Sequence, residues 1–228
     1  ATETRAKQSV TEIKRQKEIK DVYSSDQLIA SFRSPIRKRP MFMQKEKTLS
    51  QAEKGTAMHT VMQHLPFQKV LDKHEIEQYV NTYVEREILT KEEANSIDIE
   101  AIEQFFTTPI AKKMMEHPQF LREVPFSFTL NSNEVYDSWE SNRKEPILIQ
   151  GVIDCLIPVT NGWIILDYKT DFIMKVTDKE IVQLKNRYAL QIELYKRAVE
   201  SIYREPVIEM YLYFFSKGLL INMEDRAE

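Results

Sequence analysis

The spacing of apolar residues changes along this chain at about residue 122. Before that point, apolar residues recur every three or four positions, as they do along one face of an amphipathic helix. After it, apolar and polar residues alternate in several short stretches, which is the period of a strand with one buried face. The pattern therefore predicts a helical N-terminal half followed by a sheet-forming half.

Five helices are predicted in the first half. The sequence Ser50-Gln51-Ala52-Glu53 fits a capping box and begins a helix that Pro66 ends. Thr108-Pro109 matches the N-cap and the first position of another helix. Residues 5–20 are charged and have few apolar positions, so we expect their helix to dock weakly. The remaining two helices are predicted over residues 74–89 and 99–106.

Four strands and one long helix are predicted in the second half. Asn161-Gly162 is a strong hairpin-turn sequence between two apolar runs, and a second capping box, Thr177-Asp178-Lys179-Glu180, opens the helix. The strands are predicted over Val124–Leu130, Ile147–Val159, Gly162–Tyr168 and Val207–Phe215, with a turn or flexible loop over 131–145. We expect an antiparallel meander of three strands, from which the helix crosses over to the fourth. The predicted fold class is α/β (α+β), with a central mixed sheet flanked by helices.

Composition limits the class of protein. The chain has 228 residues, of which 42% are hydrophobic and 29% charged, which suits one sizeable domain with an added arm. We predict an N-terminal helix and basic linker arm over residues 1–48 and the domain over 49–228. Neither a signal peptide nor an apolar run long enough to span a bilayer is visible, so a cytoplasmic protein is expected. Because the chain begins at Ala1 rather than Met, we expect it to be a piece of a longer protein.

The cysteine count and one absent motif exclude several kinds of site. Cys155 alone can form neither an internal disulfide nor a four-cysteine zinc or iron–sulfur site. The chain has no Gly-x-x-x-x-Gly-Lys-Ser/Thr loop, so we expect no ATP site of that kind. Its net charge is −3, so contact with nucleic acid needs a local basic patch. The most basic stretch contains Arg37, Lys38 and Arg39 and is either a solvated linker or a phosphate-contacting loop.

Two carboxylates and a lysine fall on adjacent predicted strands. An acid followed two positions later by Lys occurs about once by chance in a chain of this length, and Glu12-Ile13-Lys14 and Glu18-Ile19-Lys20 are such cases. Asp167 and Lys169 differ because they end an apolar strand, on which they share a face. Asp154 lies within the neighbouring strand, where a buried acid needs a partner. Either a divalent cation between the two acids or a salt bridge between Asp154 and Lys169 would provide one.

Four further polar residues are candidates for the same group. His59 lies one helical turn after Gly55, which leaves space beside the imidazole, although an isolated histidine is more often a surface or core residue. Glu123 opens the first predicted strand and could reach the same end of the sheet. Gln191 and Tyr195 lie one turn apart on the long helix. A polar group beside an apolar stripe needs a partner, and a DNA phosphate or base is one candidate.

Taken in order, these residues resemble the RecB-type nuclease domain of the PD-(D/E)XK superfamily over about residues 50–216, which implies a restriction-endonuclease-like core. The motifs are Gly55…His59, Glu123-Val124-Pro125-Phe126, Gly151-Val152-Ile153-Asp154, Asp167-Tyr168-Lys169-Thr170 and Gln191…Tyr195. Residues 7–12 and the Arg/Lys-Pro segment after them are similar to the A-type subunits of bacterial helicase–nucleases. The single cysteine agrees with that branch, because the B-type subunits and the CRISPR-adaptation nucleases of this superfamily carry four cysteines for an iron–sulfur cluster.

The resemblance implies a metal-dependent deoxyribonuclease that uses Mg²⁺, or Mn²⁺ in its place, and has no iron–sulfur cluster. The expected metal ligands are His59, Asp154, Asp167 and the carbonyl oxygen of Tyr168. Lys169 would position or help to deprotonate the attacking water and offset charge in the transition state. Glu123 would hold a metal-bound water or a second ion. Gln191 and Tyr195 would place the DNA strand.

The resemblance also implies a role and partners. The domain would be the exonuclease of a helicase–nuclease that resects double-strand ends for recombinational repair, and it would cut single-stranded DNA, with the 3′-terminated strand expected. Its partners would be DNA, the helicase portion of the same polypeptide and a B-type subunit, with no membrane, in the nucleoid-associated cytoplasm of a bacterium. Two alternatives stay open: a non-catalytic DNA- or protein-binding module on a nuclease fold, and a stand-alone repair or restriction endonuclease.

Overall fold

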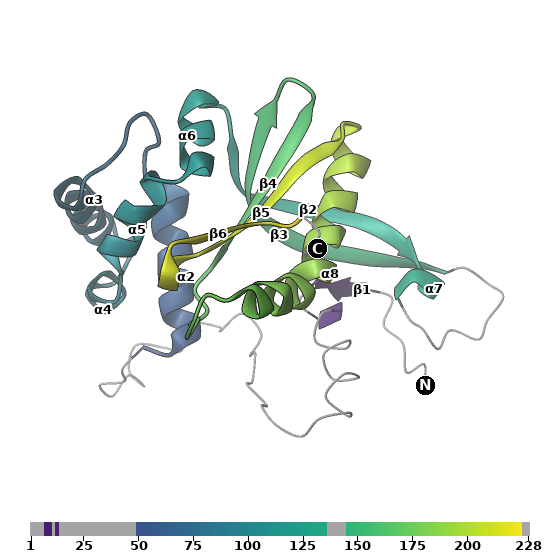
Figure 1. Ribbon diagram of the computed structural model, residues 1–228, viewed down its shortest axis with the longest axis horizontal. Helices are drawn as coiled ribbons and strands as arrows, with labels where there is room; N and C mark the ends of the chain where they lie inside the picture. The colour runs from purple at the N-terminus through teal and green to yellow at the C-terminus, as the bar shows by residue number, and fades with distance from the viewer. Residues whose placement is uncertain (1–6, 11, 14–48, 136–144, 225–228) are drawn as a thin grey trace.

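The computed structural model describes residues 7–10, 12–13, 49–135 and 145–224, which form a six-stranded mixed sheet with helices on both faces (Figure 1). The strands are β1 (Lys7–Ser9), β2 (Leu121–Asn131), β3 (Pro146–Val159), β4 (Gly162–Lys169), β5 (Val207–Phe214) and β6 (Leu219–Asn222). The helices are α2 (Gln51–His64), α3 (Lys73–Glu85), α4 (Lys91–Asn95), α5 (Ile99–Phe106), α6 (Pro109–Glu116), α7 (Ser132–Val135), α8 (Asp178–Tyr203) and the 3₁₀ helix η2 (Phe215–Lys217). Within the described ranges, no helix has the length and apolar character needed to cross a membrane.

The predicted topology of the sheet is confirmed. β2, β3 and β4 form the antiparallel meander, with β3 in the middle. α8 then leads to β5, which pairs with β4 in parallel, and β6 returns antiparallel to β5. Because β2 pairs with β3 over Pro146–Leu156, β1 and β4 share the other edge of β3. The C-terminal ends of β4 and β5 therefore lie side by side where α8 begins its crossover.

Each face of the sheet has its own apolar core. α2, α3, α5 and α6 cover one face, and α8 covers the other (Figure 1). Along β4, Leu166 and Tyr168 pack with the helical cluster, whereas Ile165 packs with the α8 side. Because side chains alternate along a strand, Asp167 and Lys169 share the face of Ile165 and point toward α8.

Arg122 fixes the end of α2 to the start of β2. Its guanidinium lies over two phenylalanine rings, with centroids 5.1 and 4.8 Å from Cζ. The last carbonyls of a helix have no partner within the helix. Arg122 Nη1 donates to three backbone oxygens there, those of Met62 at 3.2 Å, Gln63 at 2.5 Å and Leu65 at 2.7 Å. Since α2 carries His59 and β2 carries Glu123, this side chain joins two elements that bear candidate site residues.

The predicted N-terminal helix is wrong at its start, because Lys7–Ser9 is a strand that pairs with residues 148–150 of β3. Val10 and Ile13 are buried in the α8-side core, so this part is firmly packed. The strand forms because β3 offers it an open edge, which a local pattern of charges cannot show. Residues 14–48, with Arg37, Lys38 and Arg39, lie outside the described residues, and the division at residue 48 stays a prediction.

Besides the three-residue η2, three short elements were not predicted: α4, α7 within the expected 131–145 loop, and β6 after the expected last strand. α3 also ends at Glu85 instead of residue 89. Glu87 has a φ of 58°, in the left-handed region, where an α-helix cannot continue. Elements of four or five residues contain too few positions for a period to be recognised, so their stability depends on contacts with the rest of the fold.

Candidate active site

β3 and β4 bring the two predicted acids together at the end of their ladder. The last paired residues there are Cys155 and Leu166, and the next positions on the two strands are Asp154 and Asp167. The backbone N–H of Tyr168 donates to Asp154 Oδ2 at 2.7 Å. This bond holds the Asp154 carboxylate against β4, so one end of the sheet carries both acids.

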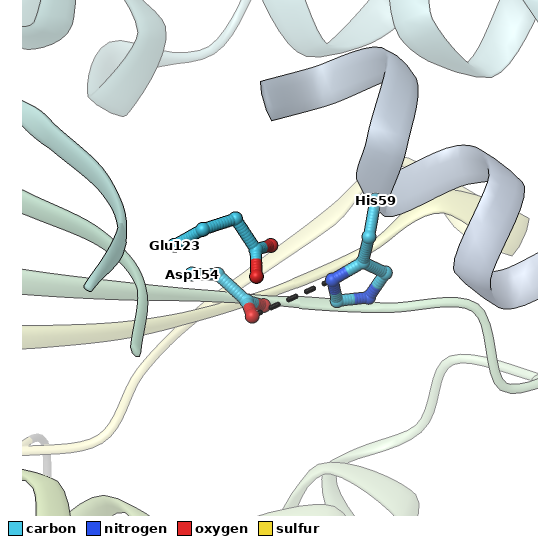
Figure 2. A group of neighbouring side chains, drawn as sticks. All are labelled: His59, Glu123 and Asp154. Carbon is cyan, nitrogen blue, oxygen red and sulfur yellow. Dashed lines mark ion pairs between the residues drawn. The ribbon is translucent and has the colours of Figure 1, made fainter. Parts of the chain in front are cut away.

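His59 and Glu123 converge on Asp154 from two other elements. Figure 2 shows His59 pointing from α2 toward the strands, with the Glu123 and Asp154 carboxylates facing its ring. His59 Nδ1 lies 3.4 Å from Asp154 Oδ1. One potential ligand atom from each of these three residues lies within 4.8 Å of the other two. Three chain segments far apart in sequence thus meet at one point.

The backbone at Glu123 is strained. Its φ is 48°, in a region that non-glycine residues rarely adopt. Glu123 lies between the paired positions Arg122–Cys155 and Val124–Ile153 and therefore faces Asp154 across the two strands. Like charges that face each other in this way are unfavourable. A strained backbone that directs a carboxylate toward another acid is typical of a functional site.

A hydrogen-bonded network joins Lys169 to α8. Lys169 Nζ lies 2.5 Å from Asp167 Oδ2 and donates to Gln191 Oε1 at 3.0 Å. Gln191 Nε2 donates to Asp167 Oδ1 at 3.2 Å and to the Tyr195 hydroxyl at 2.8 Å. The Gln191 amide therefore has partners for its oxygen and for both of its hydrogens within the protein, and Tyr195 is buried. Contact of these two residues with DNA stays a prediction.

The ion pair that forms is not the salt bridge considered as the alternative to a metal. Lys169 pairs with Asp167, its neighbour on the same face of β4, while Asp154 is partnered by His59 and by the backbone of Tyr168. The lysine therefore neutralises one acid only. The carboxylates of Asp154 and Glu123 face each other beside the imidazole of His59.

Burial and mutual repulsion alter the protonation of this group. Burial disfavours the imidazolium of His59, but the charge of Asp154 and its hydrogen bond outweigh burial and raise the pKa of His59. Burial, assisted by the charge of Asp154, raises the pKa of Glu123. Burial also raises the pKa of Asp167 to about 6, against the opposing effect of Lys169. All three shifts favour protons in the site, as expected where acids gather without a cation.

The donor set fits a hard divalent cation. His59, Glu123 and Asp154 offer an imidazole and two carboxylates, and Asp167 lies beside this group without being part of it. Asp167 Oδ2 is buried and lies 2.5 Å from Lys169 Nζ in an ion pair, but it accepts no hydrogen bond from the described residues. This oxygen keeps a lone pair for a cation. Carboxylates with one imidazole suit Mg²⁺ or Mn²⁺.

Tyr188 and Asp171 contribute to the site and were not predicted. Lys169 Nζ lies 4.3 Å from the centroid of the Tyr188 ring, and the Tyr188 hydroxyl donates to Asp171 Oδ2 at 2.8 Å. Tyr188 precedes Gln191 by one turn of α8, so helical spacing alone could have placed it on the same face. Because the neighbouring residues on that face of the helix are apolar, the sequence pattern alone indicates that Tyr188 is a core residue.

Gly55 provides space for Thr170, which directly follows Lys169. A Cβ at Gly55 would lie 2.9 Å from Thr170 Oγ1. The prediction assigned this space to the imidazole of His59, whereas the structure shows that the end of β4 needs it. The missing side chain allows α2, and with it His59, to approach the strand that carries Asp167 and Lys169.

Comparisons with known proteins agree with this geometry. The family model of the PD-(D/E)XK nuclease superfamily matches residues 32–228. Proteins named as the A-type subunit of an ATP-dependent helicase/nuclease are 53% identical over 227 residues in Oceanobacillus iheyensis, 45% over 227 residues in Bacillus velezensis and 42% over 229 residues in Bacillus cytotoxicus. The alignments cover 99%, 97% and 99% of this chain but 18% of each relative, so the chain spans a small part of their length. On the strength of the match over most of its length, the chain belongs to the PD-(D/E)XK nuclease superfamily and is a metal-dependent nuclease.

Proposed function

We propose that this chain hydrolyses phosphodiester bonds in single-stranded DNA with Mg²⁺, or with Mn²⁺ in its place. The observation that carries the proposal is the convergence of His59, Glu123 and Asp154 beside the ion pair of Asp167 and Lys169. Buried carboxylates that lie close together contribute little to stability without a cation, since their mutual repulsion and their burial both oppose folding. A lysine beside them supplies the positive group that phosphoryl chemistry needs.

The residues that would hold the ion are His59, Asp154, Asp167 and the carbonyl oxygen of Tyr168, with Glu123 close enough to take part directly or through water. An ion of this kind supplies Lewis acidity to the scissile phosphate and to the attacking water. The protein adds rigidity. Tyr168 N fixes Asp154, and Gln191 fixes Asp167, so the oxygens are oriented before any ion arrives.

Lys169 would orient the attacking water and offset the negative charge that develops on the phosphate. Its ammonium is held from three sides by Asp167 Oδ2, Gln191 Oε1 and the ring of Tyr188. Such a group needs little reorganisation during the reaction, which is the main source of electrostatic catalysis. Gln191 would thus act as a positioning residue for both Lys169 and Asp167.

The proposal for the whole protein rests on the names of the relatives, which are helicase/nuclease subunits, and on the resemblance of the motifs to RecB-type nuclease domains. We propose a helicase portion on the same polypeptide, a partner that is the B-type subunit, and action on the 3′-terminated strand during end resection for recombinational repair. The corresponding place in the cell is the nucleoid-associated cytoplasm of a bacterium. The basic residues Arg37, Lys38 and Arg39, which lie outside the described residues, would contact DNA phosphates.

The test is cleavage of end-labelled single-stranded DNA by the chain in Mg²⁺ and in Mn²⁺. We expect Lys169→Ala and Asp154→Asn to lower the rate by about 10²- to 10⁴-fold. Lys113→Ala is the matched control, because Lys113 also pairs with an acid, Glu209 at 2.5 Å, but lies outside the site. Circular dichroism checks that each variant folds. Cleavage by folded Lys169→Ala at the wild-type rate would refute the proposal.

A further inference from the structure

The loop between β4 and α8 exposes large apolar side chains directly after the candidate active site. Phe172 is 80% exposed, Met174 75% and Val176 47%. In Figure 1 this green segment runs from the end of β4 to the start of α8, below the β5–β6 turn. An aromatic ring left this open on a folded domain is unusual, because burying it would favour folding. Its position three residues after Lys169 suggests a role in binding substrate.

The backbone of this loop is held in place, so the exposure of Phe172 is built into the fold. Ile173, between the two most exposed residues, is 1% exposed and packs in the α8-side core. Its N–H donates to Ser216 Oγ at 3.3 Å, and Ser216 Oγ donates to the carbonyl oxygen of Asp171 at 2.7 Å. With Ile173 inward and its backbone fixed to η2, the neighbouring Phe172 and Met174 must point outward.

One lysine lies close to the exposed ring, and two more follow Phe172 in the sequence. Lys217 Nζ lies 6.0 Å from the centroid of Phe172, and Lys175 and Lys179 are exposed on the loop and on the first turn of α8. Within the described ranges, none of these three lysines has an ion-pair partner. The nearby acids are Asp171, which lies 4.0 Å from Arg187 Nη1 and accepts from the Tyr188 hydroxyl, and Asp178 and Glu180 at the start of α8, where they favour the positive end of the helix dipole.

The loop is also connected to the reactive lysine. Asp171, one residue before Phe172, accepts a hydrogen bond of 2.8 Å from the Tyr188 hydroxyl, and the Tyr188 ring lies against Lys169. Three extended residues span at most about 10 Å, so the Cα atoms of Lys169 and Phe172 lie within that distance of each other. A DNA strand with a phosphate at Lys169 would therefore have a neighbouring base near Phe172.

We infer that Phe172, with Met174 beside it, forms a stacking platform for an unpaired base next to the scissile phosphate, and that Lys175, Lys179 and Lys217 contact the adjoining phosphates. This inference rests on the proposed function and adds the residues that bind the base and the phosphates next to the cleaved bond. A base within a duplex already stacks on both neighbours, whereas an unpaired base has a free face for an aromatic ring. Free lysines around the ring favour a polyanion over a protein surface as the occupant.

The test measures equilibrium binding of the 228-residue chain to a fluorescent oligothymidylate in EDTA, so that no cleavage occurs. Stacking of one base on an aromatic side chain corresponds to about a 5- to 150-fold gain in affinity. We expect Phe172→Ala to weaken binding by a factor in this range and Phe172→Trp to retain it. Val176→Ala, which removes apolar surface from the same loop without removing a ring, should bind within about two-fold of wild type.

An abasic strand of the same length separates stacking from phosphate contact. Wild type should bind the abasic strand more weakly than oligothymidylate, and Phe172→Ala should bind both strands equally. Equal binding of oligothymidylate by wild type and Phe172→Ala would overturn the inference. So would a loss of affinity for the abasic strand, on substitution of Phe172 by Ala, as large as the loss for oligothymidylate. Because binding is measured without metal, a chain that stacks bases but cuts no DNA would refute the proposed function and leave this inference standing.

Discussion

Asp167→Asn should stabilise the metal-free chain, although it removes a residue expected to bind metal. Burial raises the pKa of Asp167 from 3.8 to about 6. Each pKa unit corresponds to about 1.4 kcal/mol, so ionising this buried carboxyl in the folded chain costs about 3 kcal/mol more than in the unfolded chain. This difference already includes the attraction of Lys169. Asn approximates the protonated carboxyl and avoids that cost.

The gain should depend on pH in a defined way. Below pH 3.8 the carboxyl is protonated in both the folded and the unfolded chain, so the substitution changes little. Between pH 3.8 and about 6 the unfolded chain ionises while the folded chain retains its proton, and wild type loses relative stability. The advantage of Asp167→Asn is therefore about half complete at pH 5 and reaches about 3 kcal/mol above pH 6, or about 6 to 12 °C in Tm.

The assay is urea denaturation in EDTA at pH 5 and pH 8, repeated at pH 8 with saturating Mg²⁺. Metal at 100 times its Kd stabilises wild type by about 2.7 kcal/mol, so Mg²⁺ should nearly close the gap to the variant. Glu209→Gln is the contrasting control. Burial raises the pKa of Glu209, but hydrogen bonds from Lys113 and Tyr211 outweigh it and the pKa is lowered, so this substitution should destabilise at pH 8. A destabilised Asp167→Asn in EDTA at pH 8 would refute the reasoning.

Two further predictions concern the placement of α2. Gly55→Ala puts a methyl group 2.9 Å from Thr170 Oγ1. The resulting overpacking, about 1–3 kcal/mol, should cancel the helix-propensity gain of about 1 kcal/mol and slow cleavage. Adding Thr170→Ala removes Oγ1 and leaves a Cβ 4.0 Å away, so the double variant should regain stability in urea denaturation and rate in a cleavage assay. Arg122→Met should lower the free energy of unfolding by about 2–4 kcal/mol, because three carbonyls at the end of α2 lose their donor.

The two predictions have different controls. For the Gly55 position, simple additivity of the two substitutions would contradict a clash with Thr170. For Arg122, the comparison is Arg122→Lys, which keeps the charge but lacks the planar group that reaches three carbonyls and covers two rings. If Lys restores full stability, the positive charge alone is responsible and the assigned hydrogen-bond geometry is wrong.

Much of the fold follows from local chemistry that the sequence displays. The Ser50–Glu53 capping box forms as predicted, and Thr177 accepts a hydrogen bond from Glu180 N at the start of α8. Thr160 and Asn161 join β3 to β4 at the predicted hairpin, and Gly162, the first residue of β4, has a φ of 146°. Periodicity succeeds for these elements because each contains enough residues for the pattern of its buried face to be recognised.

The short elements depended on partners that periodicity does not reveal. β1 has three residues and is stabilised by residues 148–150 of β3, on an edge that β4 occupies only over residues 155–159. β6 similarly needs β5 as a template. Strand formation of this kind depends on non-local hydrogen bonds, so a charged segment such as Lys7–Ser9 resembles a helix until its neighbour is known.

For the site, strand periodicity and residue types were sufficient to nominate Asp154, Asp167 and Lys169, whereas the ligand role of His59 came from the resemblance to RecB-type nuclease domains. The partners of these residues could not be read from their order along the chain. Tertiary structure decided that Lys169 pairs with Asp167 and that Glu123 joins His59 and Asp154 through a strained backbone. It also placed Phe172 in solvent, because Ile173 and Ser216 hold the loop. Periodicity specifies the direction of a side chain, whereas distances between segments arise only when helices and strands pack together.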